Sequence, residues 1–73
     1  MNSTSLPLVE RRQNESVIDQ VDLMAQGYSW EAYCAAREAA GYAIREGRAP
    51  EIALELAAQA LARVHASEQG ELK

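Results

Sequence analysis

Few residues in this sequence are of the types that carry out chemistry. Cys34 is the only cysteine and His65 the only histidine, and they fall in different segments. A zinc site of the usual kind needs several such ligands and is excluded. A Cys–His catalytic pair would need both residues in one cleft with an oxyanion hole. The simpler interpretation makes Cys34 a small core residue and His65 a polar residue near a helix C-terminus.

Asp19 and Asp22 are three residues apart on a predicted helix and therefore share one side of it. Such a pair can act as general acid and base where the surroundings of its two members differ. No apolar residues set these two apart, so we expect a solvated face. The sequence also has no glycine-rich phosphate loop. We therefore expect no enzyme, no metal and no cofactor.

The composition describes one small helical domain. The chain has 73 residues, is rich in alanine and lacks phenylalanine. Its net charge of −4 argues against a protein that mainly neutralises phosphates. A single cysteine allows no internal disulfide and suits a reducing cytosol. No segment is typical of a signal peptide or of the roughly 20 apolar residues of a membrane span. We expect a cytoplasmic protein.

The first predicted helix begins at Asn14, an N-cap residue, and closes at Gly27. Leu23 points away from its apolar side. That apolar side holds Val17, Ile18, Val21, Met24 and Ala25.

The second predicted helix is capped by Ser29, runs to about Glu46 and ends at Gly47. The aromatic residues at the start of this helix can serve the core, which lacks phenylalanine, or a binding surface, where tryptophan and tyrosine are enriched. We expect Trp30 and Tyr33 to point inward and Tyr28 to lie at a surface. The predicted inward side holds Trp30, Tyr33, Cys34, Ala40, Gly41 and Ile44, and is widened by Ala32, Ala36, Ala39 and Ala43.

A third helix starts at Pro50 and runs to about Ala66. Its apolar stripe holds Ala53, Leu54, Ala57, Ala60, Leu61 and Val64. The predicted fold is all-α: a compact three-helix domain with a flexible N-terminal arm and a frayed C-terminus. We assign residues 1–13 to the arm, 14–67 to the helical domain and 68–73 to a disordered tail.

Arg37 falls on the apolar side of the second helix and has two interpretations. Its stem can pack on the core while its head reaches solvent or pairs with Asp19, Asp22 or Glu38. Alternatively, this face is partly open and Arg37 belongs to a docking site.

The N-terminal arm is the main functional signal. Proline and short polar residues oppose a helix there, and four apolar residues precede two arginines. Residues 1–12 carry two arginines and one glutamate, a charge of +1; the remainder carries five basic and ten acidic residues, a charge of −5. We expect the arm to dock on a partner, although it could instead fold back as a lid. The candidate partner-binding residues are Leu6, Pro7, Leu8, Val9, Arg11 and Arg12.

The length, the acidic helical body and this arm resemble the small bacteriophage-encoded regulators that bind host RNA polymerase. The resemblance implies contacts with the polymerase β′ and β subunits, a block of σ-dependent promoter recognition, and antitermination. It places the protein in the host cytoplasm as a monomer that needs no direct nucleic-acid contact.

Two other functions remain open. Residues 23–31 are similar to a helix-turn-helix, but the next helix then starts with Pro50, Glu51 and Glu55, whose carboxylates would face DNA phosphates. A small oligomerising antitoxin or scaffold is the other alternative. Its outer seam would hold Leu23, Ile52 and Leu56.

Overall fold

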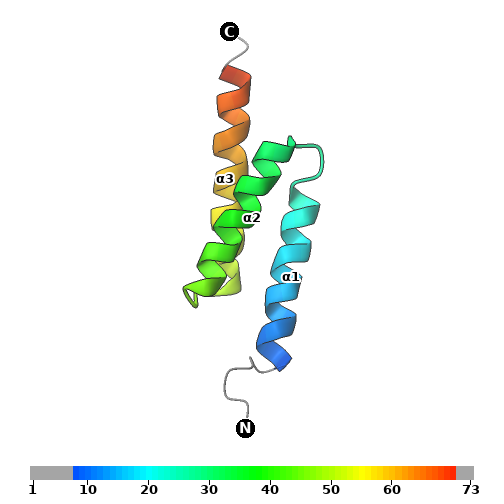
Figure 1. The fold of residues 1–73 in the computed structure, drawn as a ribbon, viewed down its shortest axis with the longest axis vertical. Helices are drawn as coiled ribbons and strands as arrows, with labels where there is room; N and C mark the ends of the chain where they lie inside the picture. Colours follow the sequence, from blue (N-terminus) through cyan, green and yellow to red (C-terminus); the bar gives the residue numbers. More distant parts are fainter. Residues whose placement is uncertain (1–7, 71–73) are drawn as a thin grey trace.

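Three helices make up the described part of the chain. The structure, a computed structural model, describes the backbone of residues 8–70 and the side chains of residues 15–70. The helices are α1 (Leu8–Met24), α2 (Trp30–Arg45) and α3 (Pro50–Gly70), with no strand among these residues. Figure 1 shows α2 running antiparallel to α3, with α1 packed beside them. The predicted all-α three-helix fold is confirmed.

Local sequence signals set the inner ends of the helices. Ser29 caps α2, since its hydroxyl accepts a hydrogen bond from the Ala32 N–H at 3.1 Å. Gly27 and Gly47 have φ of 88° and 78°, a region that favours glycine. At the end of α2, the N–H groups of Gly47 and Arg48 bond to the carbonyls of Ile44 and Ala43, which is a Schellman motif. α3 begins at Pro50, as predicted.

The core is built mainly from alanine. Of the eleven buried apolar residues described, eight are alanines, and the only fully buried side chains larger than alanine are Val17 and Val21. Small side chains let helix backbones approach closely, so α2 and α3 meet along a seam of methyl groups. We name this the alanine seam. It holds Ala32, Ala36, Ala40 and Ala43 of α2 and Ala53, Ala57 and Ala60 of α3.

The outer ends of two helices differ from the prediction. α1 begins at Leu8 instead of after Asn14, so the backbone of residues 8–13 is helical. Proline suits a helix start, and the stretch after Pro7 contains no further proline and no glycine. α3 runs to Gly70 instead of ending near Ala66, so the backbone of residues 68–70 is helical. The Ser29 hydroxyl donates a hydrogen bond to Glu68 Oε2 at 2.5 Å and anchors this last part of α3.

Candidate partner-binding surface

Trp30 is the most exposed large apolar side chain among those described. Its exposed fraction is 73%, so the prediction that it points inward is wrong. The alanines at 32, 36, 40 and 43 occupy the inward side of α2. At about 100° per residue, Trp30 lies about a third of a turn from the middle of that side. The inward prediction assumed that a core without phenylalanine needs its tryptophan, whereas the spacing of these alanines indicates the inward side correctly.

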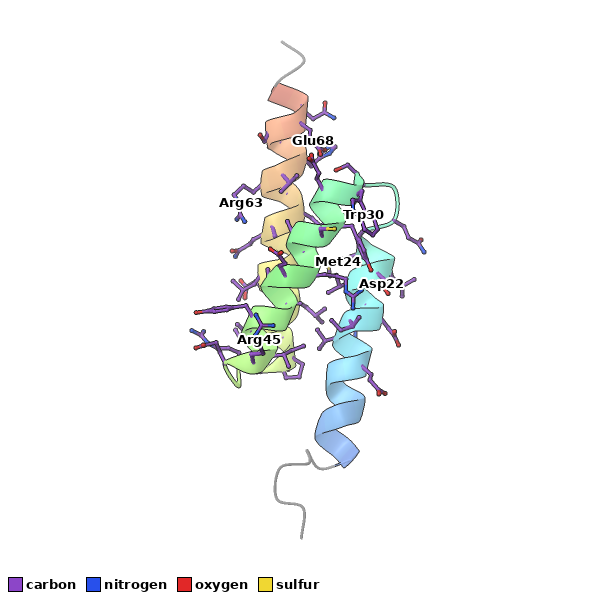
Figure 2. All side chains as sticks on the ribbon, in the orientation of Figure 1. Asp22, Met24, Trp30, Arg45, Arg63 and Glu68 are labelled. Atoms are coloured by element: carbon purple, nitrogen blue, oxygen red, sulfur yellow. The ribbon has the colours of Figure 1, made fainter. Side chains whose placement is uncertain are left out.

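Trp30 begins a cluster that joins α2 to α1. Its ring lies 5.3 Å, centroid to centroid, from that of Tyr33. The Tyr33 hydroxyl donates a hydrogen bond to Asp22 Oδ1 at 2.8 Å and accepts one from Arg37 Nη1 at 3.2 Å. The Arg37 guanidinium carbon is 5.9 Å from the Tyr33 ring centroid, within reach of a cation–π contact. We name Asp22, Trp30, Tyr33 and Arg37 the Trp30 cluster, and Figure 2 shows Trp30 and Asp22 where α1 and α2 meet.

The structure decides between the two interpretations of Arg37 in part. The side chain is exposed and sits at the open face of α2. It reaches Asp22 only through the Tyr33 hydroxyl that both residues share. Arg37 is thus held in place by an aromatic partner while its guanidinium keeps donors free for other bonds.

An apolar hollow of about 280 Å³ lies further along the boundary of α1 and α2. Glu15, Ile18 and Asp19 of α1 and Ile44 of α2 line it. The isoleucines are half-buried and the carboxylates exposed. Trp30, Tyr33, Arg37 and Ile44 recur at helical spacing along α2, so the cluster and the hollow follow one side of that helix for about 21 Å.

A second set of contacts fixes the turn between α1 and α2 to α3. The Tyr28 and His65 rings pack edge to face, with their centroids 5.3 Å apart. The next residue after Tyr28, Ser29, makes the hydrogen bond to Glu68. Tyr28 remains 41% exposed, in agreement with its predicted surface position. These contacts hold the start of α2, and with it Trp30, at a defined place.

The predicted arm falls largely outside the part of the chain that the structure describes. Leu6 and Pro7 lie outside the described residues. Leu8, Val9, Arg11 and Arg12 fall in the first turns of α1, but their side chains lie outside the described set. The docking role of these six residues therefore stays a prediction.

Other exposed apolar residues are scattered. Leu23 is 63% exposed, as predicted, and Tyr42 is 57% exposed on another side of α2. Ile52 and Leu56 are half-buried, and Leu56 packs against the core. The seam predicted from Leu23, Ile52 and Leu56 is thus partly used within the domain itself.

The comparisons with known proteins give no relative, since no family model, no curated protein and no solved structure matches the chain. Among the described residues, no group of three or more His, Cys, Asp or Glu side chains is arranged to hold a metal ion. None of the described helices has the length and apolar character of a membrane span. A function must therefore be inferred from the physical arrangement of the Trp30 cluster.

Proposed function

We propose that this protein is a regulator that acts by binding another protein, with the Trp30 cluster as its docking surface. The observation that carries this is the 73% exposure of Trp30 beside Tyr33 and Arg37. Tryptophan, tyrosine and arginine are the types most enriched among residues that dominate binding energy. The action is binding without catalysis.

The domain holds this cluster ready for a partner. The Tyr33 ring is fixed between Asp22 and Arg37, and the start of α2 is fixed by Ser29. A side chain that is already ordered loses less conformational entropy on binding. Burying the Trp30 ring would also remove a large apolar area from water, which favours association.

The partner that we propose is bacterial RNA polymerase, through its β′ and β subunits. Support comes from the resemblance to phage-encoded polymerase regulators and from the apolar and basic residues that precede and begin α1. In this proposal the protein blocks σ-dependent promoter recognition and favours antitermination in the cytoplasm of the host.

Binding of purified RNA polymerase to the immobilised protein tests this proposal. Trp30→Ala should weaken binding at least about tenfold, because loss of a central aromatic residue commonly costs about 2 kcal/mol or more. Tyr42→Ala is the matched control, since it removes an exposed aromatic from another side of the same helix; it should change the affinity less than about twofold.

The outcomes separate the parts of the proposal. No binding of the polymerase by the unaltered chain would reject that partner. Equal binding by the Trp30→Ala variant and the unaltered chain would reject the docking surface. Where binding occurs, transcription from a σ-dependent promoter should fall and read-through of a terminator should rise when the protein is added.

A further inference from the structure

The first turns of α1 extend past the other two helices. In Figure 1, the N-terminal end of α1 (blue) projects beyond the turn that joins α2 to α3. The hollow lined by Glu15, Ile18, Asp19 and Ile44 lies next to this projection. The same helix thus extends past α2 and α3 at its N-terminal end and, a few turns on, borders an open concave surface.

The hollow favours an occupant that is both apolar and basic. Its half-buried floor, Ile18 and Ile44, suits an aliphatic side chain. Its exposed carboxylates, Glu15 and Asp19, suit a neighbouring cation. An occupant must present these two types of side chain about one helical turn apart.

The projecting end of α1 has this composition. Leu8 and Arg11 are one turn apart, and they continue a stripe along α1 whose later members are Glu15, Ile18 and Asp22. The spacing alternates between three and four residues, which is the pattern of helices that pair along a seam. The stripe is basic near its start and acidic toward its end. Two copies of the stripe in antiparallel orientation therefore bring opposite charges together.

We propose that two copies of this chain pair through antiparallel α1 helices, each filling the hollow of the other. Leu8 of one copy then lies on Ile18 of the second copy. The helices run in opposite directions, so the residue three after Leu8 lies opposite the residue three before Ile18. Arg11 of one copy therefore meets Glu15 of the second copy. A two-fold axis repeats both contacts, as in most homodimers.

The composition of α1 favours a second copy as the occupant. The same chain supplies the apolar residue and the cation at the required spacing. A core made mostly of alanine methyl groups buries few large side chains, so covering Ile18 and Ile44 adds burial that a 73-residue domain needs. We propose this dimer in place of the monomer expected from the sequence. It does not rest on the proposed function, because its argument uses the hollow and the α1 stripe and not the exposure of Trp30.

Two charge reversals and their mixture test the pairing. Arg11→Glu alone places glutamate against Glu15, and Glu15→Arg alone places arginine against Arg11, so each variant should dimerise at least about tenfold more weakly than the unaltered chain. A mixture of the two restores opposite charges at both contacts and should form a heterodimer. Within one helix, each variant still carries like charges four residues apart, so recovery in the mixture reports contact between copies.

The measurement is mass by sedimentation, with a tag on one variant so that the heterodimer is distinguished. The unaltered chain should have about twice its 8.0 kDa mass. Arg63→Glu is the control, because it reverses an exposed charge on α3 away from α1 (Figure 2), and it should dimerise like the unaltered chain. Circular dichroism checks that every variant remains helical.

Two results would overturn the pairing. One is a single-chain mass at roughly 1 mM, where even a dimer with a Kd of about 1 mM is well populated. The other is a dimer that neither reversal weakens, since the copies would then meet at another surface. Neither result bears on binding of RNA polymerase, which is measured separately with the Trp30→Ala variant.

Discussion

The indole of Trp30 lies in water although it is the largest side chain of a domain with a small core. It stays there because the inward side of α2 holds alanines that pack against α3, and no space for an indole remains between the two helices. A residue of this kind contributes little to folding. Its position is instead set by its contact with the Tyr33 ring and by the Ser29 cap at the start of α2.

Trp30 is the only tryptophan, so its fluorescence tests the exposure directly. The emission maximum should lie near that of free tryptophan, and acrylamide should quench the emission readily. Trp30→Ala should change the free energy of unfolding by less than about 0.5 kcal/mol, measured by urea denaturation followed by circular dichroism.

Val21→Ala is the control for that measurement. Val21 is fully buried, so removing two methyl-sized groups should cost about 2 kcal/mol from lost burial and the cavity left behind. A blue-shifted, poorly quenched emission together with a large cost for Trp30→Ala would place Trp30 inside the core and remove the basis of the docking surface.

At the scale of the helices, the alanine seam sets the distance between α2 and α3. Protein interiors are close-packed, so a larger side chain in the seam must push the helices apart or leave its preferred rotamer. The opposite sides of both helices have no such restriction. The seam therefore separates positions that determine the fold from positions that can serve binding.

Ala36→Leu tests this restriction. Ala36 is fully buried in the seam, and the substitution should destabilise the domain by about 1–3 kcal/mol through overpacking. Ala62→Leu is the matched control, because Ala62 is exposed on α3 and leucine forms helices nearly as well as alanine. The control should lie within about 0.5 kcal/mol of the unaltered chain in thermal unfolding. Equal effects of the two substitutions would mean that α2 and α3 do not pack closely.

The helices were largely predictable, because their caps are local signals. Ser29, Gly27, Gly47 and Pro50 each set a boundary through chemistry within a few residues. The start of α1 and the end of α3 were predicted wrongly, since Asn14 is also a possible N-cap and the polar residues after Ala66 are typical of a frayed end. Glu68 helps to fix the latter through Ser29, which is 39 residues away in sequence.

Less of the candidate surface could be predicted. The exposure of Leu23 followed from helical spacing, Tyr28 was expected at the surface, and Arg37 was recognised as unusual. The link from Asp22 through Tyr33 to Arg37 joins two helices, so it depends on how α1 is rotated against α2. Periodicity along one helix gives no information about that rotation.

At the scale of the whole molecule, the helical body can be tested without the residues that precede it. The described structure begins with α1 at Leu8, so a chain that lacks residues 1–7 keeps all three helices complete. This variant should show the same helical circular-dichroism signal per molecule as the full chain. It should bind RNA polymerase more weakly if Leu6 and Pro7 contact the partner, as we propose.

The control for the shortened chain is replacement of residues 2–5, which retains Leu6 and Pro7, by glycine and serine. That variant should bind like the unaltered protein. Undiminished binding by the chain without residues 1–7 would exclude Leu6 and Pro7 from the partner contact. The remaining candidates would then be the Trp30 cluster and Leu8, Val9, Arg11 and Arg12.

The alanine seam also has an evolutionary consequence. The seven positions of the alanine seam accept neither larger nor polar side chains. Descendants of this chain must therefore keep small residues there, while the outer surface is free to diverge. Alanine is the most favourable residue in helices of every kind, so the part of the sequence under the strongest constraint is also the part that says least about ancestry. Kinship would be traced through the intervals between these alanines, and through what each lineage retains at position 30.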